Sequence, residues 1–120
     1  MFDHIGLKVK DLTKSRRFYA AALAPLGAEV QSQGEGFVGI GPKGQPRLWL
    51  SQGEAQGVAH VAFFSKDRAG VAAFHRAAVG AGGKDNGAPG LRPHYHKDYY
   101  GAFVIDPDGN NVEAVCHKAE

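Results

Sequence analysis

The sequence predicts an α+β protein built from two copies of one β-α-β-β-β unit, and two observations support this prediction. The segment that begins at His4 matches the segment that begins at His60 at a single offset of 56 residues, without a gap. Seven of the 24 aligned positions are identical, whereas chance gives about one or two, so a repeated structural unit is indicated. Each copy also starts with alternating apolar residues and continues with apolar residues at helical spacing. The identical residues of the first copy are His4, Lys10, Asp11, Phe18, Ala21, Ala22 and Gly27.

The elements of the first unit follow from periodicity and turn residues. Residues 3–9 alternate, with Ile5, Leu7 and Val9 on one side, which predicts a strand with one apolar face. Asp11 or Thr13 can cap a helix over 12–24. Gly27 follows this helix as a C-cap glycine. We expect the remaining strands at 28–32, 36–41 and 46–51.

The second unit repeats this order. A strand is expected over 58–65, followed by a helix over 68–80 that Asp67 can cap. The glycine-rich stretch 80–90 is expected to break the helix. We expect two further strands, near 99–105 and 111–117, on either side of the turn at Asp106-Pro107-Asp108-Gly109.

Length and composition limit the class of protein. The 120 residues predict one domain over 1–120, with repeats of about 1–55 and 56–120. Hydrophobic residues make up 43% and charged residues 22% of the chain, as in ordinary globular proteins. No apolar run is long enough to span a membrane and no signal peptide is evident, so we expect a cytoplasmic protein without a membrane partner. The single Cys116 excludes an intrachain disulfide, and we expect it to be buried.

The charge pattern does not favour nucleic-acid binding. The net charge is +2, and the basic residues Lys14, Arg16 and Arg17 lie together in the first helix. A solvated helix face accounts for this cluster, because no second basic stripe with interleaved aromatic residues accompanies it. We therefore expect no nucleic-acid partner.

Strand alternation places three potential metal ligands on one side of the sheet. His4 and His60 are out of phase with the apolar residues of their strands, and Glu113 is out of phase with those of the last strand. If the helices cover the apolar face, all three side chains point to the opposite face. Two imidazoles and one carboxylate can bind a divalent Fe, Mn, Ni or Zn ion and leave positions open for a substrate. The alternative is that the three are unrelated polar residues, which is the usual role of any one of them alone.

Several sequence runs around these residues are similar to those of a known family. The runs are Asp3-His4-Ile5-Gly6-Leu7, Asp11-Leu12, Phe18-Tyr19, Ala59-His60-Val61-Ala62-Phe63 and Asp106-Pro107-Asp108-Gly109-Asn110-Asn111-Val112-Glu113. Through them the chain resembles, over essentially its whole length, the vicinal oxygen chelate superfamily. This superfamily contains glyoxalase I, extradiol ring-cleaving dioxygenases, fosfomycin-resistance thiol transferases and bleomycin-binding proteins.

The resemblance implies a fold, a cofactor and a partner. The fold would be two βαβββ repeats that form a curled mixed sheet around a divalent metal ion. His4, His60 and Glu113 would be the metal ligands, and the substrate would be a small molecule with vicinal oxygens. Small members commonly form their sites across a homodimer, so His4 would come from one chain and His60 with Glu113 from the other.

The resemblance leaves the reaction open between isomerase or lyase, ring-cleaving dioxygenase and thiol-transferase chemistry. The glyoxalase type carries a second glutamate at or beside the position of Trp49. The thiol transferases carry a small hydroxyl residue where this chain has Gly6, and the dioxygenases carry a tyrosine where it has Phe103. A non-catalytic binding protein of the bleomycin-resistance type is the main alternative. An accessory protein without chemistry of its own is a third.

The segment from Leu91 to Tyr100 is dense in functional groups. It can form a lid over a ligand, in which His94, His96 and Tyr99 act as catalytic groups. Substrate-binding residues would then be Trp49, Arg92, Tyr95 and Phe103, with Arg92 or Lys97 facing an anionic group. The alternative is a polar surface loop with stacked aromatic rings. We expect His75 to lie on the helix surface and His117 to be mostly in solvent.

Overall fold

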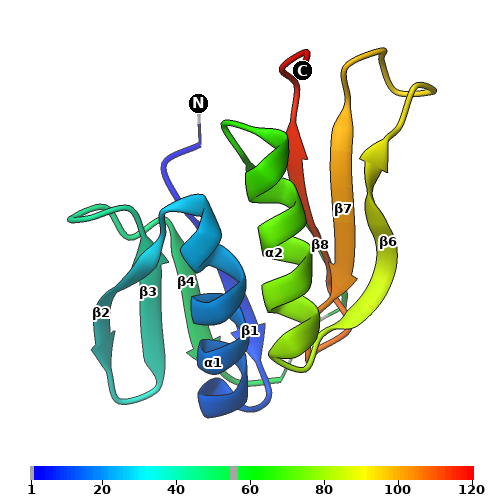
Figure 1. The fold of residues 1–120 in the computed structure, drawn as a ribbon. Helices are drawn as coiled ribbons and strands as arrows, with labels where there is room; N and C mark the ends of the chain where they lie inside the picture. The colour runs from blue at the N-terminus through cyan, green and yellow to red at the C-terminus, as the bar shows by residue number, and fades with distance from the viewer. Residues whose placement is uncertain (1, 55–56) are drawn as a thin grey trace.

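The fold is α+β, and it contains the β-α-β-β-β unit twice, as the sequence predicts (Figure 1). A computed structural model of the chain describes residues 2–54 and 57–120. The first unit consists of β1 (Ile5–Val9), α1 (Leu12–Leu23), β2 (Glu29–Gly34), β3 (Phe37–Gly41) and β4 (Leu48–Gln52). The second consists of β5 (His60–Phe64), α2 (Arg68–Gly80), β6 (Lys84–Leu91), β7 (Tyr100–Ile105) and β8 (Asn111–Cys116). The expected boundary between the repeats, at residues 55–56, lies outside the described residues.

Each repeat folds into its own mixed sheet, and the two sheets have the same strand order. The orders are β1-β4-β3-β2 and β5-β8-β7-β6. In both sheets the first strand pairs in parallel with the last, and the other pairs are antiparallel. The helices α1 and α2 lie side by side on one face of the sheets (Figure 1). Among the residues that the structure describes, no helix covers the opposite face of either sheet.

Matching aspartates begin the two helices. The side chain of Asp11 accepts a hydrogen bond from the backbone N–H of Lys14 at 3.0 Å, and Asp67 does the same for Gly70 at 2.8 Å. These bonds satisfy N–H groups that have no partner within the helix. The cap of α1 is thus Asp11 rather than Thr13.

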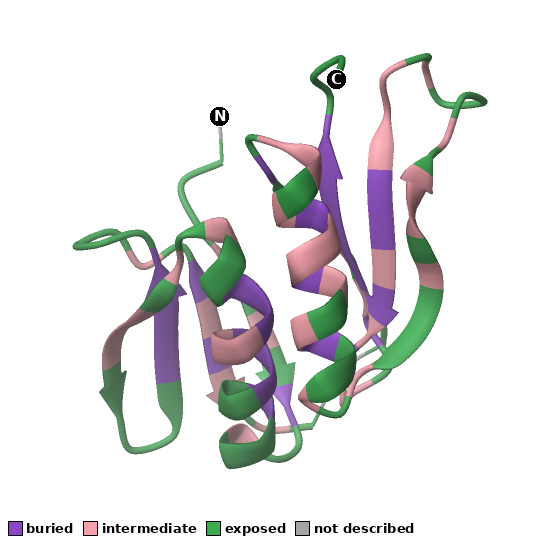
Figure 2. Cartoon of the chain, in the orientation of Figure 1, coloured by how far each residue is buried: buried purple, intermediate pink, exposed green. Residues whose placement is uncertain are grey.

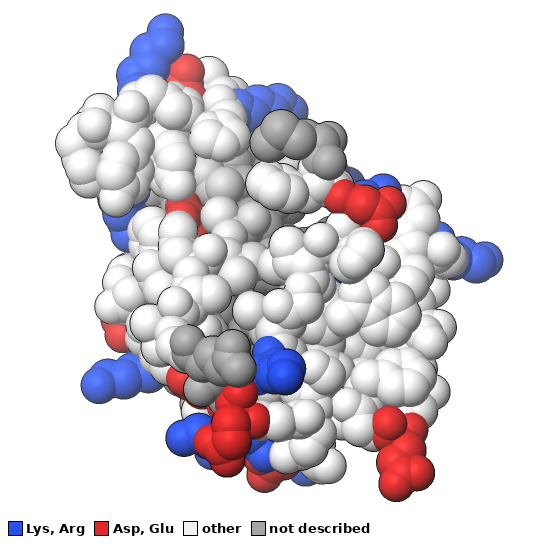
Figure 3. Space-filling model, turned by 180° about the vertical axis from the view of Figure 1, so that it is seen from behind, with Lys and Arg blue, Asp and Glu red and all other residues white. Residues whose placement is uncertain are grey.

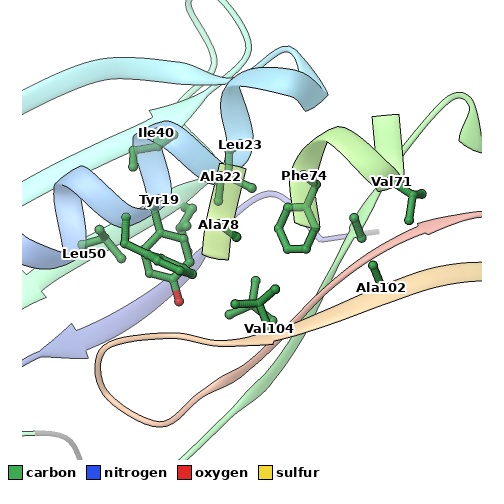
Figure 4. Close-up of a cluster of buried hydrophobic side chains, with 14 of the residues drawn as sticks. Tyr19, Ala22, Leu23, Ile40, Leu50, Val71, Phe74, Ala78, Ala102 and Val104 are labelled. Carbon is green, nitrogen blue, oxygen red and sulfur yellow. The ribbon is translucent and has the colours of Figure 1, made fainter. Parts of the chain in front are cut away.

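The hydrophobic core lies between the helices and the sheets (Figures 2 and 4). Phe18 and Tyr19 of α1 and Phe74 of α2 are fully buried in it. The sheets contribute buried aliphatic side chains from β3, β4, β7 and β8. Cys116, at the end of β8, is also fully buried, as expected.

A buried polar contact ties the repeats to each other. The hydroxyl of Tyr19, on α1, donates to Asp106 in the turn before β8. Asp106 also accepts from the backbone N–H groups of Asp108 and Asn110, each at 2.8 Å. Asp108 in turn accepts from the backbone N–H of Lys10 at 3.0 Å. The turn of the second repeat therefore fixes the start of the first repeat's helix.

The structure corrects two sequence predictions. The stretch expected only to break the second helix contains β6, and the first strand begins at Ile5, so His4 precedes it. β6 has the sequence KDNGAPGL, in which Gly and Pro conceal the strand pattern. It is an edge strand with register shifts against β7, and an edge position tolerates Pro89. No helix among the described residues is long and apolar enough to cross a membrane.

Candidate functional site

The candidate site lies on the face of the second sheet that the helices leave open. In β8, Val112, Ala114 and Cys116 are fully buried in the core under the helices. Glu113 has the opposite parity and is nevertheless only 2% exposed. Its carboxylate is covered by groups from β5 and from the segment before β7. A buried carboxylate requires such partners, because removing its charge from water is costly.

His60, the first residue of β5, is one of these partners. Its Nε2 lies 3.1 Å from Oε1 of Glu113, and its Nδ1 lies 3.0 Å from the carbonyl oxygen of Asn111. A carbonyl oxygen only accepts, so Nδ1 carries the proton and donates it. In the neutral imidazole, the Nε2 lone pair then faces the carboxylate. Only a proton or a bound cation between the two groups stabilises that arrangement.

The geometry of this pair fits a metal ion. A histidine ligand usually donates its other ring N–H to a carbonyl or a carboxylate, as His60 does. Two ligand atoms at about 2.1 Å from one ion, at a right angle, lie about 3 Å apart. The His60–Glu113 separation of 3.1 Å matches this value. His60 and Glu113 therefore suit two positions of a metal site.

Tyr99 is the second partner of Glu113. Its hydroxyl donates to Oε2, on the side of the carboxylate away from His60. Burial, followed by the hydrogen bond and the negative charge of Glu113, raises the pKa of Tyr99 above its usual value. The phenol is therefore protonated at neutral pH and acts as a donor.

The loop from Arg92 to Tyr99 closes one side of a cavity of about 710 Å³. Backbone hydrogen bonds from Arg92 to Tyr99 and from Tyr99 to His96 fold the loop onto itself. The cavity brings together seven of the ten predicted site residues. They are His60, His94, Tyr95, His96, Tyr99, Phe103 and Glu113, and the other lining residues are Asn111 and His117.

Arg92 does not line this cavity. Its guanidinium donates to the carbonyls of Ala88 at 2.8 Å and Gly90 at 3.0 Å. It also lies over the ring of Phe103, 5.4 Å from the ring centre. Arg92 thus holds the irregular strand β6 against β7. Its proposed contact with an anionic substrate stays a prediction.

Trp49 occupies the position in the first sheet that Glu113 occupies in the second. Glu113 pairs with Ala62, two residues after His60, and Trp49 pairs with Gly6, two residues after His4. Trp49 lies beside Gly39, where a Cβ atom would be 2.6 Å from the indole ring. The indole therefore lies over the glycine, and the first repeat has no carboxylate at this place.

His4 lies apart from Glu113 within one chain. Its side chain is 57% exposed and bonds to Asp3 at 2.6 Å. With His60 it lines a separate cavity that does not include Glu113. In residues 2–54 and 57–120, no group of three His, Cys, Asp or Glu side chains is placed to hold a metal ion. That His4 of a second protomer supplies a third ligand stays a prediction.

His117 and Asn111 are two cavity residues that the sequence patterns did not predict as site residues. Both line the cavity, and His117 contacts His96, with Nδ1 of His117 and Nε2 of His96 separated by 2.7 Å. Strand alternation could have identified both residues, because positions 111, 113 and 117 share one face of β8 and its extension. His117 is exposed, as expected, but it also contacts His96, which was not expected.

The fold and site define a class: a protein of paired β-α-β-β-β units with a histidine–carboxylate pair on an open sheet face. The sequence model of the glyoxalase/bleomycin resistance protein/dioxygenase superfamily matches residues 1–114. The chain belongs to this superfamily. None of the curated proteins compared with the chain matches it.

Solved structures of similar fold agree with this assignment. A glyoxalase/bleomycin resistance protein from Albidiferax ferrireducens is 26% identical, with a TM-score of 0.83 over 97% of this chain and 98% of that chain. A hypothetical protein from S. aureus is 25% identical, with a TM-score of 0.69 over 94% of each chain. A glyoxalase/bleomycin resistance protein/dioxygenase family enzyme from Burkholderia phytofirmans has a TM-score of 0.76 over 97% of this chain and 98% of that chain. At 17% identity it shows a shared fold alone.

Proposed function

We propose that the protein is a divalent-metal-dependent enzyme that acts on a small molecule with two neighbouring oxygen atoms. The observation that carries this proposal is the His60–Glu113 pair, with its 3.1 Å separation and its fixed His60 tautomer. Iron, manganese, nickel and zinc all accept imidazole and carboxylate ligands. A bound ion of this kind supplies Lewis acidity to the substrate oxygens.

The chain's own residues bind and orient the substrate. Phe103 lies beside Glu113 across β7 and β8, and its ring is 6.3 Å from that of His60 with the planes within 24°. Phe103 thus forms a flat wall next to the metal position. The Tyr99 hydroxyl donates a hydrogen bond to Oε2 of Glu113 and thereby holds the carboxylate in one orientation. His94 and His96 of the loop both line the cavity, but both ring nitrogens of His96 are hydrogen-bonded, to His117 and to the Asp98 N–H, so His94 is the stronger acid or base candidate.

We further propose that the third ligand is His4 of a second protomer in a homodimer. Two features support this. Phe64, the last residue of β5, is 72% exposed. Seen from behind, charged side chains lie mostly at the margins of the molecule, and uncharged surface fills most of the middle (Figure 3). A largely uncharged face with exposed aromatic residues is suited to a partner of the same kind.

Elemental analysis of protein purified without chelators tests the proposal. We expect close to one divalent ion per chain in the unmodified protein, and loss of most of it in His60→Ala and Glu113→Ala. His75→Ala is the matched control, because His75 bonds to Asp85 at 2.9 Å and lies outside the cavity. Stoichiometric metal in both ligand variants would refute the proposal. Oxygen uptake with catechols and a glyoxalase assay would then assign the reaction.

The second candidate function is ligand binding without chemistry. The cavity favours it, because seven of its nine lining residues carry rings and the described residues of one protomer bring only two potential ligands together. In that case the purified protein would contain no metal and would still bind planar compounds. Metal content and ligand binding, measured on the same sample, distinguish the two functions.

A further inference from the structure

His96 and His117 form a directly hydrogen-bonded pair of imidazoles at one side of the cavity. They are 21 residues apart in sequence, and Nε2 of His96 lies 2.7 Å from Nδ1 of His117. The ring planes are within 23° of each other and the ring centres are 5.0 Å apart. The distance between the ring centres is close to the sum of the nitrogen–nitrogen distance and the two ring radii. The rings therefore meet edge to edge, in line, through one shared hydrogen.

The backbone fixes the direction of this hydrogen bond. The N–H of Asp98 donates to Nδ1 of His96 at 3.1 Å, so Nδ1 carries no proton in the neutral ring. Nε2 of His96 is then protonated and donates to Nδ1 of His117. Because that nitrogen accepts, the proton of His117 is on its Nε2. The pair thus leaves the Nε2–H of His117 without a partner among the described residues.

His117 is well placed to use this donor. It lines the same cavity as His60 and Glu113, and its ring packs edge-on against Tyr99 with centres 5.3 Å apart. Tyr99 cannot serve a ligand in the same way, because Glu113 accepts its hydroxyl hydrogen. No Lys or Arg is among the nine lining residues, so the cavity offers no full positive charge of that kind to an anionic group.

We propose that His117, held in this tautomer by His96, donates a hydrogen bond to a carbonyl-type oxygen of the ligand. The ligand class is a planar ring compound that carries two neighbouring oxygens and, away from them, one acceptor oxygen. Ring walls favour the planar part, and an N–H donor favours the acceptor. His117 is then a binding residue and His96 a positioning residue. This inference rests on the proposed function, because the two neighbouring oxygens locate the ligand at His60 and Glu113.

The test compares two probes in the protein as purified, by titration calorimetry under argon. Catechol has the neighbouring oxygens alone, and 3,4-dihydroxyacetophenone adds a neutral acceptor. Substitution His117→Leu removes the donor, whereas His117→Gln keeps an N–H near the same place. We expect the affinity ratio of the acetophenone to catechol to fall about fivefold in His117→Leu. His117→Gln should retain most of the ratio, and catechol affinity should change little in either variant.

The positioning role of His96 has its own comparison. Substitution His96→Leu should lower the affinity ratio, and His96→Gln, which preserves a donor to His117, should restore it without a change in thermal stability. His75→Leu is the control and should leave the ratio unchanged, because His75 is bonded to Asp85 outside the cavity. An unaltered ratio in His117→Leu, or no binding of either probe by the unmodified protein, would overturn the inference. A metal-free protein that keeps the His117-dependent ratio would support it and refute the proposed metal function alone.

Discussion

The repeats differ at one pair of neighbouring residues on the open face. In the second sheet Glu113 stands beside Phe103, and in the first sheet Trp49 stands beside Gly39. The small carboxylate has an aromatic neighbour, whereas the large indole has a neighbour without a side chain. Each sheet therefore keeps one aromatic ring on this part of its surface. The exchange removes a potential metal ligand from the first repeat and replaces it with a ring.

The fit between Trp49 and Gly39 predicts the effect of Gly39→Ala. The new Cβ atom would lie 2.6 Å from the indole, so the ring must move away from the sheet. We expect a loss of about 1–3 kcal/mol in the free energy of unfolding and a red shift in the emission of the chain's single tryptophan. Urea denaturation and fluorescence measure both effects. Unchanged emission with unchanged stability would refute this packing.

A glycine in open space provides the comparison. Gly80 ends α2, and a Cβ atom there would meet nothing within 4 Å. Alanine has the higher helix propensity, so Gly80→Ala should stabilise the protein by up to about 1 kcal/mol. A loss of similar size at both positions would show that the effect at Gly39 does not come from the indole.

Individual site residues were predictable where strand parity decides their direction. Alternation placed His60 and Glu113 on one face, and the structure brings them within 3.1 Å of each other. Alternation does not describe loops, so the contact of the Tyr99 hydroxyl with Glu113 depended on the hydrogen bonds of the 92–99 segment. The tautomer of His60 depends on the carbonyl of Asn111, which is distant in sequence, and that of His96 depends on the N–H of Asp98 in the loop. No pattern of side chains in the sequence shows these backbone contacts.

At the level of elements, the caps were predictable and β6 was not. An aspartate directly before a helical pattern is typically the N-cap, and both Asp11 and Asp67 cap their helices. β6 forms because β7 offers an unpaired edge, and not because its own residues favour a strand. Its shape also depends on Arg92, which lies beyond its end and donates to two of its carbonyls. Such a strand is set by tertiary contacts.

The cap of α2 predicts a modest and local stability effect. Substitution Asp67→Ala removes the acceptor of the Gly70 N–H and should cost about 1 kcal/mol in urea denaturation. Asp67→Asn retains an acceptor oxygen and should recover most of this loss. Equal losses in the two variants would mean that the charge of Asp67, and not its hydrogen bond, stabilises the helix.

At the scale of the whole molecule, the buried contact of Tyr19 with Asp106 predicts how stability depends on pH. Burial, followed by the charge of Asp106 and the hydrogen bond to it, raises the pKa of Tyr19. The unfolded chain loses this proton near pH 10, whereas the folded protein keeps it. The folded state therefore binds more protons above about pH 10, and stability is present below that pH and falls as pH rises.

Substitution Tyr19→Phe tests this link between the repeats. At neutral pH the variant should lose about 1–2 kcal/mol of unfolding free energy, because the bond to Asp106 is absent. Above about pH 10 its stability should fall less steeply than that of the unmodified protein. Urea denaturation at pH 7 and at several alkaline values measures both. The same slope in both proteins would exclude Tyr19 as the titrating group.

The proposed arrangement of the site across two chains predicts subunit complementation. His60 and Glu113 lie together in one protomer, and His4 lies apart from Glu113. His4→Ala and Glu113→Ala homodimers should each lack metal. After subunit exchange, the mixed dimer has one intact site, with His4 from the Glu113→Ala chain and both other ligands from the His4→Ala chain. An equal mixture should therefore bind about one ion for every four chains.

A mixture of His60→Ala with Glu113→Ala is the control and should bind none, because no chain then carries both clustered ligands. Recovery in the control, or none in the first mixture, would refute a shared site.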